Sequence, residues 1–133
     1  MSSGLTLAEA TSILGAAIRK ARELNILISV AVCNEEGHLI AFNRMDGAIL
    51  ESDRFSVGKA VASAGTGLPS GRIEGMDYHP LLAVAEGMPA FRIPGGLPIF
   101  RNGQIAGACG VDGARSHEQE EECARAGIAS IPN

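Results

Sequence analysis

The stretch PIFRNGQIAGACGV, residues 98–111, decides the fold. Its centre, Asn102-Gly103, is typical of a two-residue turn between antiparallel strands, because both residue types tolerate the positive φ angles that such a turn requires. We therefore expect a hairpin with strands over 98–101 and 104–111. Small residues share one face of the second strand and offer a shallow surface on which a helix can pack closely; they are Ala106, Ala108 and Gly110.

Apolar periodicity and turn residues predict the rest of the chain. Thr6 with Glu9, and Ser116 with Gln119, have the spacing of capping boxes at helix starts. The further elements expected are a helix over 7–24, strands over 26–33 and 38–44, a small-residue helix over 49–65, a short helical segment at 80–86 and a last helix over 116–129. Two hairpins separated by helices indicate an α+β fold, with an antiparallel sheet flanked by helices in a single domain over 1–133.

Composition excludes several classes of protein. The 133 residues are 46% hydrophobic and 20% charged, so the bulk of the chain is expected to fold. A formal net charge of −4 argues against nucleic-acid binding, and no window of 18 apolar residues is present to span a membrane. Three cysteines without CxxC spacing, and a start that lacks a basic region followed by an apolar stretch, predict a reduced, cytoplasmic protein.

Two basic residues are candidates for binding an anion. Lys59 is the one charged residue between positions 55 and 68, where it either holds an anionic ligand or extends to solvent at the helix edge. Arg44 offers a planar guanidinium to a carboxylate or phosphate. Asp46 either joins the same site, caps the following helix or forms a surface ion pair with Arg44. The residues themselves leave these alternatives open.

A glycine loop and the histidines are further candidates. Gly95-Gly96 is consistent either with backbone amides that contact an anion or with a plain tight turn. The three histidines are candidates for haem or metal ligation and for acid–base chemistry. His79 lies in the least regular segment, where functional loops tend to occur, whereas His38 and His117 are interpreted as solvated surface residues.

Several ordered motifs run nearly from one end of the chain to the other. They are LTLAEA (5–10), EGHL (36–39), RMDGA (44–48), SD (52–53), KA (59–60), PGGLPI (94–99), GQIAG (103–107), GV (110–111) and EQEE (118–121). Taken in this order, they resemble the GlcG/HbpS-like family, a haem-binding-uptake group that includes the C-terminal domain of PduO-type proteins. The resemblance implies a profilin-like sandwich that assembles as a dimer or a higher homo-oligomer.

The resemblance also implies a pocket near Lys59 and Gly95-Gly96. The first hypothesis is a small-ligand protein whose pocket holds an anionic organic molecule, haem being one candidate. Arg44 and Lys59 would then bind carboxylates with help from the glycine amides, and His79 would be the axial ligand of haem. Asp112 stands where a serine is common in the family, and it either pairs with Lys59 or supplies a base to the pocket.

A second hypothesis is a cofactor-free lyase or isomerase that acts on a small organic or aromatic acid in a catabolic pathway. Lys59 or Glu120 would then serve as general base or acid, with Arg44 orienting the substrate. A third hypothesis is an oligomer that stabilises a partner enzyme.

Overall fold

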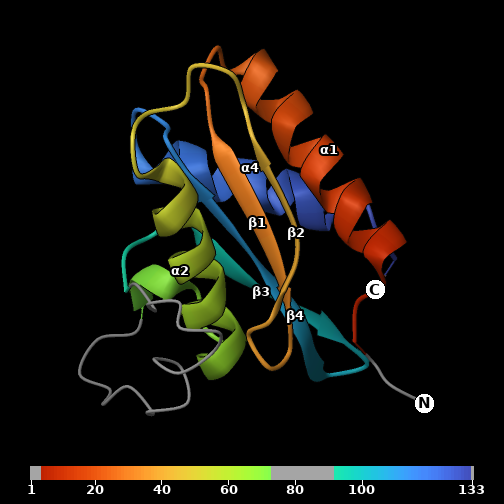
Figure 1. Ribbon diagram of the computed structural model, residues 1–133. Helices are drawn as coiled ribbons and strands as arrows, with labels where there is room; N and C mark the ends of the chain where they lie inside the picture. The colour runs from red at the N-terminus through yellow and green to blue at the C-terminus, as the bar shows by residue number, and fades with distance from the viewer. Residues whose placement is uncertain (1–3, 73–91, 133) are drawn as a thin grey trace.

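A computed structural model describes residues 4–72 and 92–132 (Figure 1). The elements are α1 (Leu7–Glu23), β1 (Ser29–Asn34), β2 (Leu39–Arg44), α2 (Ser52–Thr66), the 3₁₀ turn η1 (Ser70–Arg72), β3 (Gly96–Arg101), β4 (Gln104–Asp112) and α4 (His117–Ile128). The strands form one antiparallel sheet in the order β2-β1-β4-β3. The predicted α+β fold is therefore confirmed, while the short helix expected at 80–86 lies outside the described residues.

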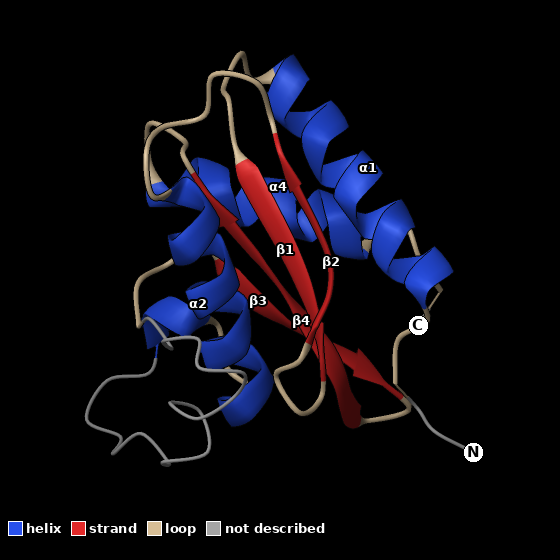
Figure 2. Ribbon diagram, in the orientation of Figure 1, coloured by secondary structure: helices blue, strands red, loops and turns tan. Residues whose placement is uncertain are grey.

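Helices cover both faces of the sheet (Figure 2). On one face, α2 packs through small residues against β1 and β4, with Val57, Val61 and Ala108 among the buried side chains. Gly110 is essential to this contact, because a Cβ there would collide with the backbone oxygen of Ser56. The predicted shallow surface on the second strand of the hairpin thus receives the small-residue helix, as the sequence indicated.

On the other face, α1 and α4 enclose the larger apolar core, which includes Ile13, Val30 and Cys123. The capping box of α1 is present, since the Thr6 hydroxyl accepts from the Glu9 amide at 3.1 Å and the Glu9 carboxylate accepts from the Thr6 amide at 3.0 Å. No helix in the described ranges is long and apolar enough to cross a bilayer.

The cap of α4 differs from the one expected. Ser116 accepts from the Gln119 amide at 3.2 Å, as predicted. The Gln119 side chain, however, accepts from the Arg115 amide, one residue before the cap, so the reciprocal half of the capping box is displaced.

Two element boundaries differ from the predicted ones for local reasons. The first strand begins at Ser29 rather than 26, because the Ile26 amide still donates to the Ala21 carbonyl at the end of α1. The second helix begins at Ser52 rather than 49, because Glu51 has a left-handed φ of 73° that breaks the helix before it. The Asn102-Gly103 turn has φ angles of 54° and 77°, as a hairpin turn of this kind requires.

Candidate functional site

Lys59 lies on α2 and is completely buried. Its ammonium donates to the Val111 carbonyl at 3.0 Å, to Asp112 Oδ1 at 2.7 Å and to Glu120 Oε1 at 3.0 Å. An ammonium group has three donors, so all of them have partners within the chain. The alternative in which Lys59 extends to solvent is therefore wrong. Its anionic partners in the structure are Asp112 on β4 and Glu120 on α4.

Glu120, on the first turn of α4, is the most highly connected member of this cluster. Besides Lys59, its Oε1 lies 3.0 Å from Nδ1 of His117, and its Oε2 accepts from the amides of Gly113 and Ala114 at 3.0 and 3.4 Å. These contacts tie α2, the end of β4 and the start of α4 together. We call Lys59, Asp112, Glu120 and His117 the lysine cluster.

Asp112 is the carboxyl of the lysine cluster that lies nearer to solvent, with 15% of its side chain exposed against 5% for Glu120. Burial raises the pKa of Asp112 above its ordinary value. The Lys59 ammonium opposes that rise, and the negative charge of Glu120 adds to it. One buried cation thus faces two carboxylates.

Gly95-Gly96 covers the lysine cluster from the start of β3. A Cβ at Gly95 would lie 2.7 Å from the Lys59 ammonium, and its φ of 131° is one that side chains rarely permit. The Gly95 carbonyl accepts from the Val111 amide, and the Gly96 amide donates to the Ser70 hydroxyl at 2.9 Å. The loop therefore allows a close approach over Lys59, and the Gly96 amide is already bonded within the chain.

Arg44 and Asp46 lie away from the lysine cluster. The Arg44 guanidinium donates to the Ser52 hydroxyl at 3.1 Å and to the Ala48 carbonyl, so it braces the connection from β2 to α2. In the sheet, Ser29 pairs with both Arg44 and Asp112 and separates them, which places their Cα atoms about 10 Å apart. Asp46 is exposed and does not cap α2, because the cap position is Glu51.

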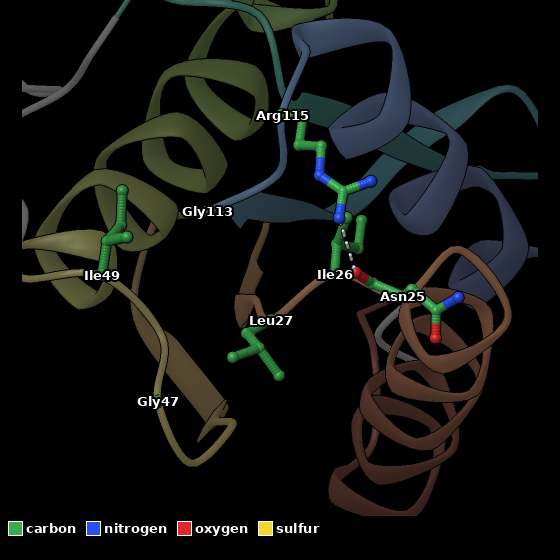
Figure 3. A pocket seen from close by; sticks show the side chains of 7 residues that line it. All are labelled: Asn25, Ile26, Leu27, Gly47, Ile49, Gly113 and Arg115. Atoms are coloured by element: carbon green, nitrogen blue, oxygen red, sulfur yellow. Dashed lines mark hydrogen bonds between the residues drawn. The ribbon is translucent and has the colours of Figure 1, made fainter.

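A cavity of about 210 Å³ opens at the end of the sheet (Figure 3). Its lining residues are Asn25, Ile26, Leu27, Gly47, Ile49, Gly113 and Arg115. Of the site residues predicted from the sequence that fall within the described part of the chain, none lines it. The Arg115 guanidinium reaches the Asn25 carbonyl at 3.5 Å across the cavity. The volume is below the roughly 300–1,000 Å³ of pockets that enclose whole ligands.

The histidines and cysteines differ in accessibility. His79, the predicted haem ligand, lies outside the described residues. His38 and His117 are both exposed, whereas all three cysteines are fully buried, and burial raises the pKa of Cys33 to about 12 and of Cys123 to about 11. Within 4–72 and 92–132, no group of three or more histidine, cysteine or acidic residues is placed to hold a bare metal ion.

The comparisons with known proteins identify the family. The family model described as haem degrading protein HbpS-like matches residues 5–129, nearly the whole chain. The chain belongs to the HbpS-like family. The resemblance seen in the ordered sequence motifs is thereby confirmed.

Individual proteins and solved structures support the family assignment. Protein GlcG of Escherichia coli K12 is 34% identical over 109 residues, which cover 77% of this chain and 76% of GlcG. A crystal structure of a double mutant of Streptomyces reticuli HbpS has a TM-score of 0.87 and 30% identity, covering all of this chain and 90% of that one. A PduOC complex with haem, at 23% identity and a TM-score of 0.80, covers 96% of this chain and 95% of its own and shows the same fold.

Sequence reasoning missed the contact between His117 and Glu120. From the sequence, His117 was interpreted as a solvated surface residue. The three-residue spacing from His117 to Glu120 could have indicated this contact, because side chains at that spacing share a helix face. What the spacing does not reveal is that Lys59 and the Gly113 amide hold the Glu120 carboxylate in place.

Proposed function

We propose that this chain is a haem-binding protein. The observation that carries the proposal is the match of residues 5–129 to a family described as haem degrading. The likeness to HbpS, which extends over the whole chain at a TM-score of 0.87, supports it. Haem is one example of the anionic organic ligand proposed from the sequence, because its two propionates are carboxylates.

The described residues fit what haem requires. Haem iron takes axial ligands such as histidine, and an exposed imidazole is present at His117, at the start of α4. At the end of the sheet, the exposed side chains of Leu27 and Ile49 offer apolar surface, and Arg115 offers a cation for a propionate. When bound, haem would supply an iron centre capable of binding oxygen species or exchanging an electron.

The size of the sheet-end cavity bears on how haem binds. At about 210 Å³ it takes one edge of a porphyrin and does not enclose the ring. We therefore expect haem to be covered by a second copy of the chain, in the homo-oligomer that the family resemblance implies. In this proposal the buried contacts of Lys59 with Asp112 and Glu120 brace the fold beside the site. The protein would act as a cytoplasmic haem carrier alongside catabolic enzymes.

An absorbance titration with haemin tests the proposal. We expect a saturable Soret shift with a fixed ratio of haem to chain, at micromolar haemin. Protoporphyrin IX without iron is the matched control, because it offers the same apolar ring but no metal to coordinate. A response that never saturates, or one that iron-free porphyrin reproduces in full, would show that the chain does not bind haem specifically.

Asp112 supports a second candidate, a cofactor-free lyase or isomerase for a small organic acid. Its largely buried carboxyl has a raised pKa beside a buried cation, as expected of an acid–base catalyst. Lys59 and Glu120 would position Asp112, and Arg44 would hold the neighbouring loop. The test is a thermal-shift screen of small organic acids followed by turnover assays. Asp112→Asn should abolish turnover while the protein stays folded, and unchanged turnover would exclude this role.

A further inference from the structure

His117, the first residue of α4, combines an accessible ring with a fixed partner. Its side chain is 58% exposed, and its Nδ1 lies 3.0 Å from Oε1 of Glu120, whose side chain is 5% exposed. An exposed imidazole on a helix surface ordinarily turns freely about its side-chain torsions. Here the buried carboxylate restrains the ring, while the rest of it stays open to solvent.

The contacts of Glu120 determine which ring nitrogen carries the proton. The Glu120 oxygens already accept from the Lys59 ammonium and from the amides of Gly113 and Ala114, so the group acts as a carboxylate that only accepts hydrogen bonds. Nδ1 of His117 must therefore be the donor. In the neutral ring, the lone pair then lies on Nε2, the nitrogen that does not face Glu120.

We propose that His117 is an axial ligand of haem iron, binding through Nε2, and that Glu120 is its positioning residue. This inference rests on the proposed function. Imidazoles that ligate metals almost always donate their other ring N–H to a carboxylate, a carbonyl or water, which fixes the ring orientation and makes the ligand more basic. The His117–Glu120 pair has this arrangement before any ligand is bound.

The surrounding charges suit ferric iron. Glu121 lies four residues after His117 and therefore on the same helix face, and Arg115 lies two residues before His117. Negative charge near the iron favours the more positive oxidation state. The Arg115 guanidinium is available to a propionate at the edge of the same ring, where the sheet-end cavity opens.

Haemin titrations of matched histidine variants test the role of His117. We expect His117→Ala to lose the saturable Soret shift or to move its wavelength. His38→Ala, which changes the other exposed histidine of the described residues, should bind haem as the wild type does. Free imidazole should restore the Soret band of His117→Ala by replacing the missing ligand. If the wild type binds haem and His117→Ala binds it with the same spectrum and affinity, His117 is not the ligand and the proposed function still stands. If the wild type itself fails to bind, the proposed function fails.

A measurement on the ligand-free wild type tests the role of Glu120 without relying on a variant that disturbs the lysine cluster. Long-range proton–nitrogen NMR of the histidine rings should show His117 protonated on Nδ1 in its neutral form. Glu120→Gln, if its circular dichroism matches the wild type, should weaken haem binding about 10–100-fold. A neutral His117 ring protonated mainly on Nε2 would overturn the positioning role.

Discussion

Replacing Lys59 by methionine removes one charge from the interior and keeps a side chain of similar length. In the wild type the ammonium lies 2.7 Å from Asp112 and 3.0 Å from Glu120. Without it, two carboxylates remain side by side in a region that is largely closed to water. The backbone carbonyl of Val111 also loses its donor. The expected result is a large loss of stability, because a buried charge left without its partner is costly.

The size of the loss follows from the burial of the pair. Removing one partner of a buried ion pair costs about 3–5 kcal/mol, against a total of about 5–15 kcal/mol for a domain. For a chain of this length, that corresponds to a fall in Tm on the order of 10–20 °C. Lys20→Met is the matched control, because Lys20 contacts Glu23 and Glu122 at 3.4 and 3.3 Å on the surface. Exposed pairs of this kind contribute little to stability, because water and salt screen the two charges.

The pH dependence of the stability of Lys59→Met is a second test of the same argument. Burial already raises the pKa of Asp112 in the wild type, and removing the opposing cation raises it further. A carboxyl whose pKa is higher in the folded chain binds more protons when folded, so lowering the pH stabilises the fold. Lys59→Met should therefore recover part of its lost stability as the pH falls from 7 toward the ordinary pKa of an aspartate.

Urea and thermal unfolding should be followed by far-ultraviolet circular dichroism, since the chain has no tryptophan and one tyrosine. A loss no larger than that of Lys20→Met would refute the reasoning. So would a large loss that is the same at pH 7 and pH 5.

Two further substitutions test the packing of α2 and the link from α1 to the hairpin. Gly110→Ala should destabilise the fold by about 1–3 kcal/mol or more, because its Cβ would collide with the Ser56 carbonyl. Gly15→Ala is the control and should be neutral or stabilising, because its Cβ meets only ordinary contacts. Equal Tm values for the two variants would contradict the close packing of α2. Glu9 forms an ion pair with Arg101 at the end of β3, in addition to its capping-box contacts. Glu9→Gln weakens both and should cost about 1 kcal/mol at pH 7. The Thr6 amide and then Arg101 hold the pKa of Glu9 below its ordinary value, so its contribution is present above that value and is lost as the pH falls through the folded pKa. A difference in Tm from the wild type that persists at pH 2 would contradict this account.

The elements that depend on neighbouring residues were predictable from the sequence. The Asn102-Gly103 turn needs two positive φ angles, and the Thr6–Glu9 box needs only one helical turn. A few neighbouring residues therefore determine each of them. The boundaries at Ser29 and Ser52 were placed wrongly. They depend on how the chain leaves α1 and enters α2, where a backbone bond to Ala21 and the φ of Glu51 decide the outcome.

The site was predictable only in part, because its contacts join distant parts of the chain. A lone lysine in an uncharged helix drew attention to Lys59, and Asp112 was named as one possible partner. Asp112 and Glu120 lie 53 and 61 positions after Lys59 in the sequence. The packing of α2 and α4 around the end of β4 brings both carboxylates to Lys59. Arg44 was expected to face a ligand, but its loop folds back so that the guanidinium reaches Ser52.

The most direct test of the account is pulsed electron paramagnetic resonance of the ferric haem complex, prepared from protein labelled with nitrogen-15 histidine. Only the nitrogens of the chain's three histidines carry the label, so a coupling between the iron and a labelled nitrogen identifies imidazole ligation. The account predicts this coupling in the wild type and its loss in His117→Ala. A saturable haem complex in which no labelled histidine nitrogen is coupled to the iron would contradict it.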